Sequence, residues 1–588
     1  MPYEAPLPWM RLALEQAAQA SGLAALPGPA EALQDYSQAV LEGAARIAGE
    51  LLSPLNRTGD EFGAKLAADG RVQTAPGFAS AYQRFCEDGW TALAAPSEFG
   101  GQGLPLLLAA ATTEMWGGAN LAFAMCPEVA VGAIEALRLH ASPALRERYL
   151  LPLVSGESAA SMALTEPQAG SDLSTVTTSA VPDGDAWRLT GRKIFISWAE
   201  HDLTANIVHL VLARTPGAPA GSRGLSLFVV PKLLPGARGE SARNDIRVIS
   251  LEHKLGIRAS PTCALTLGEH GGARGWLVGE LHAGLACMFT MMNHMRLGVG
   301  LHSCGVAERS RQLALSYARE RRQGRDASGV PATLIAHADV RRMLLTIATL
   351  TQAARTLAYT AAGLIDVAQS EQASADARTQ ATLRLGLLTP IVKAWCSDIA
   401  VEASSLAVQI YGGMGYMAEC EVSQLYRDAR IGPIFEGTNY IQAQDLLNRK
   451  VFGDGGAALG DWLEQMRQAA AVLPADEPAL RPLREQLPLE CAALTTAASH
   501  LMQLRASERD LTGSVAYPFL QWLAVTAGAW QWALSAHTAV ARPKDPLSRA
   551  ILADAAFYAA HILPRARASA AIIAAGASPV ANASSELF

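Results

Sequence analysis

Cysteine is scarce in this chain of 588 residues, and its eight cysteines are scattered, with no two at Cys-x-x-Cys spacing. This distribution excludes a disulfide-rich secreted framework and a cysteine-based zinc site, so we expect reduced thiols and no bound metal. Residues 1–11 carry no basic stretch followed by an apolar one. We therefore expect no secretory signal and a cytoplasmic location.

An excess of basic residues is also lacking. The chain has 48 Lys and Arg residues against 54 Asp and Glu residues, which gives a formal net charge of -6. Because no dominant positive field is present to neutralise phosphates, we expect no nucleic-acid partner. Charged residues make up only 17% of the chain and hydrophobic residues 50%. This balance excludes a disordered chain and a coiled coil.

One long segment lacks charge altogether. Residues 511–541 contain no Asp, Glu, Lys or Arg, and a helix of this length would be long enough to cross a bilayer. Polar residues such as Thr512, Gln521 and Gln531 dilute the segment. We therefore interpret it as a helix buried on most sides in a globular core and expect no integral membrane segment. A membrane-spanning helix is the alternative, and peripheral membrane contact stays open.

The texture of the sequence predicts a mainly α protein with a β insert. Residues 1–158 have apolar positions at helical spacing, and residues 283–453 return to that pattern. Between them, residues 159–282 hold short β-rich runs broken by turn residues, among them residues 187–191, 194–198 and 246–251. This pattern is typical of a small antiparallel barrel or sandwich. After a Gly-rich stretch, the Ala-rich residues 461–588 predict an additional helical domain. The expected order is an N-terminal helical domain, a β-domain, a helical bundle and an extra C-terminal helical domain.

Two segments of the β insert carry residue types suited to a cofactor. Residues 162–172, Met-Ala-Leu-Thr-Glu-Pro-Gln-Ala-Gly-Ser-Asp, offer small side chains and approachable backbone amides, as an anionic or heteroaromatic group requires. An ordinary capped turn is the alternative. In residues 193–197, Lys-Ile-Phe-Ile-Ser, strand alternation places Phe195 and Ser197 on one face. They would offer a platform and a hydrogen-bond donor to a flat ring, although such a pair is often only core plus surface.

Two segments of the helical bundle complete the set. Residues 409–416, Gln-Ile-Tyr-Gly-Gly-Met-Gly-Tyr, form a Gly-rich helix end, for which a simple helix stop is the default explanation. Residues 434–442, Ile-Phe-Glu-Gly-Thr-Asn-Tyr-Ile-Gln, hold a lone carboxylate, Glu436, and such a group is solvated in most loops. Here apolar neighbours such as Phe435 would remove water, raise its pKa and make it a stronger base. Gly437 would let a ligand approach the backbone closely.

The order of these segments resembles the acyl-CoA dehydrogenase family. Thr-Glu-Pro-x-Ala-Gly-Ser-Asp comes first and Lys-x-Phe-Ile-Ser second; Arg296, Arg321, Gly-Gly-x-Gly and Glu-Gly-Thr follow, within an α–β–α layout. The resemblance covers about residues 30–450. The opening Met-Pro-Tyr-x-Ala-Pro-Leu and the extra C-terminal helices are similar to the long bacterial branch of the family, which includes 3-methylmercaptopropionyl-CoA dehydrogenases.

The resemblance implies FAD as cofactor, bound between the β-domain and the C-terminal helices of a homodimer. The residues that match FAD contacts within one subunit are Met162, Leu164, Thr165, Ser171, Phe195, Ser197, Thr438 and Tyr440. Those that match contacts with the dinucleotide of a neighbouring subunit are Arg321, Gln323, Gln409 and Gly413. Those that match the substrate side are Ser171, Asn293, Arg296, Glu436 and Gly437.

The resemblance also implies a reaction. Glu436 would take the α-proton of an acyl-CoA thioester while the β-hydrogen leaves as hydride to flavin N5, which gives a trans-2-enoyl-CoA. Reduced flavin would pass its electrons to electron-transfer flavoprotein. The substrate would be either a linear fatty acyl-CoA of fatty acid β-oxidation or 3-methylmercaptopropionyl-CoA, since a thioether is nearly isosteric with a methylene. Two alternatives are an acyl-CoA oxidase that uses oxygen and a non-catalytic flavin- or CoA-binding scaffold, against which the presence of Glu436 argues.

Overall fold

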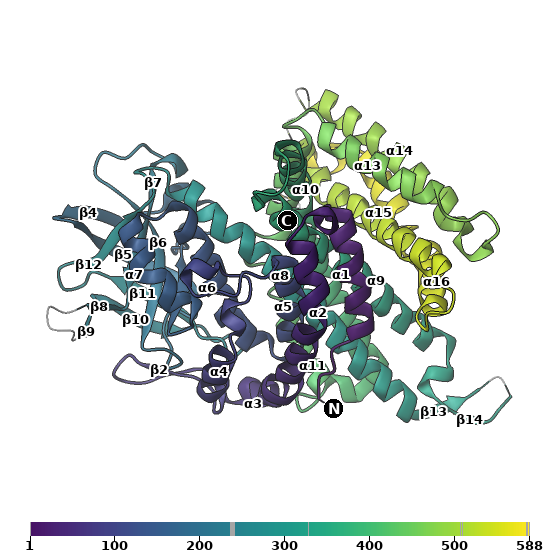
Figure 1. Cartoon of the computed structure of the whole chain (residues 1–588), viewed down its shortest axis with the longest axis horizontal. Helices are drawn as coiled ribbons and strands as arrows, with labels where there is room; N and C mark the ends of the chain where they lie inside the picture. The colour runs from purple at the N-terminus through teal and green to yellow at the C-terminus, as the bar shows by residue number, and fades with distance from the viewer. Residues whose placement is uncertain are drawn as a thin grey trace.

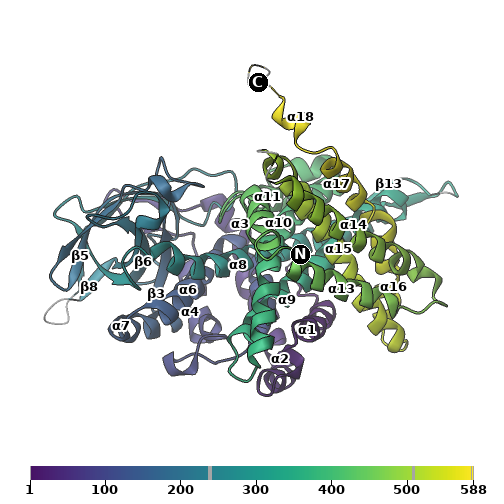
Figure 2. The ribbon, with the colours of Figure 1, turned by 90° about the horizontal axis from the view of Figure 1, so that it is seen from above.

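The computed structural model describes residues 2–235, 241–326, 328–505, 507, 510–583 and 586. The β-domain lies at one end of the molecule, long helices fill the middle, and the C-terminal helices cover the opposite side (Figures 1 and 2). The fold class predicted from the sequence is confirmed, with helices before and after a single β insert.

The N-terminal helical region packs closely against the middle of the molecule. Its helices are α1 (Leu7–Ser21), α2 (Pro29–Arg46), α3 (Ser53–Phe62), α4 (Phe78–Glu87), α5 (Leu106–Ala119), α6 (Leu121–His140) and α7 (Pro143–Val154), and a short hairpin pairs β1 (Lys65–Leu66) with β2 (Val72–Gln73). Asn120 begins α6 by accepting a hydrogen bond from the amide of Phe123, a standard N-cap. A Cβ atom on Gly117 would lie 2.6 Å from Cα of His302. Glycine therefore lets α5 approach the backbone of the long helix that carries Arg296.

The β-domain is built around one long strand. Its strands are β3 (Ser158–Ala163), β4 (Ser179–Asp183), β5 (Ala186–Ser197), β6 (Asn206–Arg214), β7 (Leu225–Pro231), β8 (Leu233–Pro235), β9 (Ser241–Arg243), β10 (Ile246–Leu251), β11 (Thr262–Leu267) and β12 (Ala273–Val278). The first half of β5 pairs with β4 and β12, and its second half pairs with β11. The expected antiparallel pairing holds for these ladders, but β3 runs parallel to β6. The two halves of β5 thus pair with different neighbouring strands of one eight-stranded sheet.

Three long helices form the bundle that follows. They are α8 (Gly284–Glu320), α9 (Ala338–Gln369) and α10 (Ala375–Tyr411); the short elements after them are the 3₁₀ turn η8 (Gly412–Tyr416), α11 (Glu421–Ala429), α12 (Asn439–Gln444) and the π-helical segment η9 (Asp445–Val451). Between α8 and α9, the strands β13 (Arg322–Arg325) and β14 (Pro331–Thr333) pair as a hairpin. The hairpin projects from the side of the molecule that lies away from the β-domain (Figure 1).

The extra C-terminal region consists of α13 (Ala457–Ala471), α14 (Arg481–Leu504), α15 (Leu511–Ala541), α16 (Ser548–Phe557), α17 (Arg565–Ala574) and α18 (Ser578–Ala581). Helix α15 is the charge-free segment of the sequence, and most of its residues are buried. Trp532 donates to the carbonyl of Thr349 on α9, and Ser535 pairs with Gln16 on α1. The interpretation of this segment as a buried core helix is confirmed. Within the described ranges, no helix is long and apolar enough to cross a membrane.

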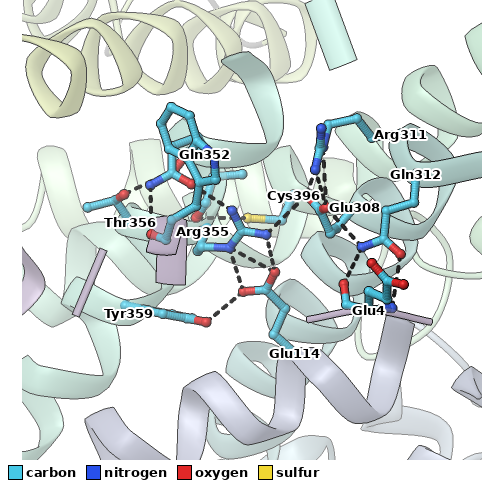
Figure 3. A network of polar contacts seen from close by, with 12 residues as sticks. Glu4, Glu114, Glu308, Arg311, Gln312, Gln352, Arg355, Thr356, Tyr359 and Cys396 are labelled. Carbon is cyan, nitrogen blue, oxygen red and sulfur yellow. Dashed lines mark hydrogen bonds and ion pairs between the residues drawn. The ribbon is translucent and has the colours of Figure 1, made fainter. Parts of the chain in front are cut away.

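A buried ionic network joins the helical layers. Arg355 of α9 contacts Glu114 of α5 and Glu308 of α8, and Tyr359 donates to Glu114. Figure 3 shows these side chains pointing toward one another between the helices. Because each charge is removed from water, the network is stable only while every partner is present.

Candidate active site

Glu436 lies in the loop between α11 and α12, in an uncommon backbone conformation. The φ angles of Glu436 and Gly437 are 57° and 85°, and left-handed backbone costs a residue with a side chain about 1–2 kcal/mol. Thr438 begins α12 by capping its first turn, and the amide of Asn439 donates to the carbonyl of Pro433 at 3.0 Å. These contacts after Glu436 hold the strained conformation, which is typical of functional sites.

Arg296 of α8 holds the main chain of this loop. Its Nε donates to the Glu436 carbonyl at 3.5 Å, and its Nη1 donates to Oδ1 of Asn293 at 3.1 Å. Nε2 of Gln442 donates to the same carbonyl of Glu436 at 3.2 Å. The structure thus brings together Asn293, Arg296, Glu436 and Gly437, four of the five residues assigned to the substrate side. Ser171 lies in the β-domain.

The carboxylate of Glu436 is partly shielded from solvent. Its Oε2 atom is buried and has no hydrogen-bond partner among the described residues, although the residue as a whole is only half-buried. Burial raises the pKa of Glu436 to about 7, while the charges of Arg296 and Lys393 act in the opposite direction. A carboxylate with such a pKa takes up and releases a proton near neutral pH, as a general base must.

The Met162–Ser171 segment is attached to β5 by a buried ion pair. Nζ of Lys193 lies 3.0 Å from Oε1 of Glu166 and 2.9 Å from the Leu164 carbonyl, and the amide of Ile194 donates to the Thr165 carbonyl. Burial opposes the charge of Glu166, but Lys193 and neighbouring threonines hold its pKa at about 2. Burial lowers the pKa of Lys193 to about 8 against the attraction of Glu166, so both members of the pair are charged at neutral pH. The pair fixes the predicted cofactor segment beside the predicted cofactor strand.

A bulge in β5 presents an exposed aromatic ring. Two residues, Ile194 and Phe195, stand opposite Ala264 of β11, and φ of Phe195 is 59°. The Phe195 side chain is 59% exposed, which is unusual for a large apolar group on a β-strand. Ser197 is half-buried two residues further on. In the Met162–Ser171 segment, a Cβ atom on Gly170 would meet no other atom within 4 Å, so an open space adjoins this backbone.

The four residues assigned to a neighbouring subunit gather elsewhere. Tyr317 of α8 stacks on Tyr411 of α10 with ring centroids 4.1 Å apart, so the ends of these helices lie side by side. Arg321 and Gln323 follow one helix end; Gln409 and Gly413 flank the other. All four are exposed. The hairpin that contains Gln323 lies on the side away from β5 (Figure 1), so this group is separate from the Phe195 surface of the same chain.

The sequence did not single out three polar residues around Glu436. Lys393 of α10 is buried and donates to Oδ1 of Asn439 at 2.9 Å. Gln442 supports the Glu436 carbonyl, as described above. One signal was available for Lys393, because it interrupts the apolar run Pro-Ile-Val-Lys-Ala-Trp at residues 390–395. A lysine within such a run is rarely buried without a specific partner.

Comparison with known protein families finds four domain models that match the chain in succession. Models of the acyl-CoA dehydrogenase N-terminal, middle and C-terminal domains match residues 57–157, 161–269 and 282–451. A model described as "Acetyl-CoA dehydrogenase C-terminal like" matches residues 462–584.

The matched domain models follow the order of the helical and β regions of the fold, and together with the relative named below they define the chain as an oxidoreductase. The chain belongs to the acyl-CoA dehydrogenase family, as its order of motifs indicated. It is 45% identical to the 3-methylmercaptopropionyl-CoA dehydrogenase of Ruegeria pomeroyi over 92% of each chain.

Solved structures of the same fold also span the extra C-terminal region. Caenorhabditis elegans ACDH-11 in complex with C11-CoA gives a TM-score of 0.77 at 22% identity, over 94% of this chain and 93% of that one. A Bacillus anthracis acyl-CoA dehydrogenase complexed with FAD gives 0.73 at 22% identity, over 92% and 88%.

Proposed function

We propose that this chain catalyses the FAD-dependent α,β-dehydrogenation of an acyl-CoA thioester to a trans-2-enoyl-CoA. The observation that carries the proposal is the covered, unpartnered Oε2 of Glu436. Glu436 takes the α-proton, and its backbone amide donates to the thioester carbonyl, which stabilises the developing enolate. Removal of water by the bound acyl chain raises the pKa of the base further.

FAD is the expected cofactor, and the exposed ring of Phe195 fits it. The Phe195 ring is a flat apolar surface beside the half-buried hydroxyl of Ser197. Contact with a flavin ring would remove this apolar surface from water. Met162, Leu164, Thr165 and Ser171 would hold the cofactor from the neighbouring segment; Thr438 and Tyr440 would hold it from the loop after Glu436. When bound, FAD supplies the acceptor for the β-hydride. Electron-transfer flavoprotein is the proposed acceptor of the electrons.

The separation of the Arg321 group from the Phe195 surface supports a homodimer. If both groups contact FAD, the two surfaces come from different subunits. We expect Arg321→Ala to weaken FAD binding about 10- to 100-fold, the range for loss of one charged hydrogen bond. Flavin absorbance of the protein after gel filtration measures the retention.

The matched control is Arg481→Ala, which removes an exposed arginine paired only within α14. It should retain FAD as the unaltered protein does. Equal FAD retention by Arg321→Ala would contradict the contact across subunits.

The substrate proposal takes support from the relative named 3-methylmercaptopropionyl-CoA dehydrogenase. We expect anaerobic addition of 3-methylmercaptopropionyl-CoA to bleach the flavin band. Pentanoyl-CoA is the matched comparison, because it differs only by a methylene in place of the sulfur. Butyryl-, octanoyl- and palmitoyl-CoA complete the panel for the linear fatty acyl alternative.

The outcomes of this panel distinguish the substrate classes and the electron acceptor. Bleaching by the linear chains but not the thioether would overturn the thioether proposal and favour a fatty acyl substrate. Bound flavin that no thioester bleaches would overturn the substrate class. Rapid re-oxidation of the bleached flavin by oxygen would favour an acyl-CoA oxidase over a dehydrogenase.

A further inference from the structure

Lys393 is a cation buried near the proposed base. Lys393 is fully inaccessible to solvent on α10, and its Nζ donates to the neutral amide oxygen of Asn439 at 2.9 Å. Asn439 follows Glu436 by three residues and begins α12. No carboxylate of the described residues forms an ion pair with this Nζ, and an ammonium group that is buried without one is costly. A neutral donor would satisfy Asn439 equally well, so the charge of Lys393 needs its own explanation.

The amide of Asn439 is held in turn by α10. Its Nδ2 donates to the Ala394 carbonyl at 3.0 Å, to Oγ of Ser397 at 3.0 Å and to Oδ1 of Asp398 at 2.8 Å. These contacts, with a further one from the Ser397 hydroxyl to Oδ1 at 3.3 Å, fix which side of this amide faces Lys393. The oxygen faces the ammonium and the nitrogen faces the carboxylate.

Asp398 continues the chain of contacts into the extra C-terminal region. Its Oδ2 accepts hydrogen bonds from the hydroxyl of Tyr517 at 2.7 Å and from Nε2 of Gln521 at 2.7 Å. Both donors lie on α15, the charge-free helix. A second contact joins α15 to α12, since Nε2 of Gln444 donates to the Thr512 carbonyl at 2.7 Å. The C-terminal region is thus in polar contact with α10 and with α12, the helix that follows the loop of the proposed base.

The charged groups around Glu436 and Lys393 shift one another's pKa values. Burial lowers the pKa of Lys393 to about 7, against the attraction of Glu436 and Asp398 and with the repulsion of Arg296. Arg296 and Lys393 are the cations that lower the pKa of Glu436. Burial lowers the pKa of Arg296; Asp445 of η9 acts against this shift, and Arg449 of η9 adds to it.

We propose that Lys393 is a positioning residue that sets the proton affinity of Glu436, and that α15 holds it in place through Tyr517, Gln521, Asp398 and Asn439. The proposal rests on Glu436 being the base. It assigns the extra C-terminal region a role in the chemistry, because two donors of this relay belong to it.

Lys393→Met tests the charge at nearly constant volume. Without the cation, the ionised form of Glu436 loses an attraction and its pKa rises. Turnover needs the ionised form, so the acidic limb of the pH profile of kcat/KM moves to higher pH, by about one unit when one nearby positive charge is lost. At a pH one unit below the original limb, the rate falls further, by about 10-fold. Lys393→Arg should restore most of the original profile.

Tyr517→Phe tests the relay from the C-terminal region. Loss of this hydroxyl removes a hydrogen bond that lowers the pKa of Asp398, so Asp398 holds its charge less strongly and supports Lys393 less. The acidic limb should move in the same direction by a smaller amount. Tyr558→Phe is the matched control: its hydroxyl donates to the Val525 carbonyl within the C-terminal region, and its loss should leave the pH profile unchanged.

A second readout needs no turnover. Infrared titration of the FAD-loaded protein follows the carboxylic acid C=O band that disappears in Glu436→Gln, and its midpoint should rise in Lys393→Met and Tyr517→Phe. A band and a pH profile that stay in place in a folded, active Lys393→Met protein would overturn the proposal. If no acyl-CoA reduces the unaltered protein but the band still shifts, the proposed function fails while the influence of Lys393 on Glu436 stands.

Discussion

Replacing Glu436 with glutamine is expected to lower the rate of flavin reduction by acyl-CoA by at least about 10²- to 10⁴-fold, the contribution of a positioned general base. The amide has almost the same volume as the carboxylate but cannot accept the α-proton. Its backbone hydrogen bonds to Arg296 and Gln442 use the carbonyl of residue 436 and survive the substitution. Anaerobic stopped-flow measurement of the flavin band gives the rate directly.

The same variant should still bind FAD and should be at least as stable as the unaltered protein. Burial disfavours the charged form of Glu436, and a neutral amide removes that unfavourable contribution. Glu402→Gln is the control, because Glu402 pairs with Arg565 at the surface and should leave the rate unchanged. A Glu436→Gln protein that reduces its flavin at the original rate would exclude Glu436 as the base.

The sequence predicted the order of domains because each has its own local period. Helical spacing marks the helical regions, and short β-rich runs mark the insert, so Ile246–Leu251 is a strand in both prediction and structure. The two runs at residues 187–191 and 194–198 were expected as separate strands, but they join in the single strand β5. The two residues between the runs, Arg192 and Lys193, continue the strand by pairing with Thr266 and Leu265 of β11, and their charge made the sequence look interrupted there.

The candidate site was predicted only in part, and the missing part is non-local. Glu436 stood out because its apolar neighbours are adjacent in sequence. Lys393 acts on it from another helix through Asn439, 46 residues further along the chain, and no local pattern links them. The roles of the predicted FAD contacts stay predictions. The structure adds that the Arg321 group lies on another side of the chain than the strand that carries Phe195 (Figure 1).

The charge-free helix α15 was also predicted only in part. Its composition predicted burial, which Trp532 and its neighbours confirm. Composition did not predict that Tyr517 and Gln521 would face Asp398. Apolar content determines whether a helix is buried, whereas the few polar residues on it determine which surface it covers.

The network around Arg355 leads to the largest expected effect on stability. The guanidinium is 2% exposed and Glu114 is completely buried. Nε donates to both carboxylate oxygens of Glu114, at 2.8 and 3.0 Å, and Nη1 donates to Gln352 at 2.6 Å. Arg355→Met would leave the charge of Glu114 without its cation in an apolar core. Breaking a buried pair from one side costs about 3–5 kcal/mol, and the midpoints of thermal and urea unfolding should fall accordingly.

The double variant Arg355→Met, Glu114→Gln separates this cost from a loss of packing. If the unpaired charge is the main cause, the second substitution recovers most of the lost stability, because it removes the uncompensated carboxylate. Glu308 keeps Arg311 and Gln312 as partners in both variants. An equal loss in the single and double variants would show that the shape of Arg355 matters more than its charge. Packing of the Arg355 side chain would then be what joins α5, α8 and α9. The charges of the network would determine which helices pack together, and would add little to the free energy of unfolding.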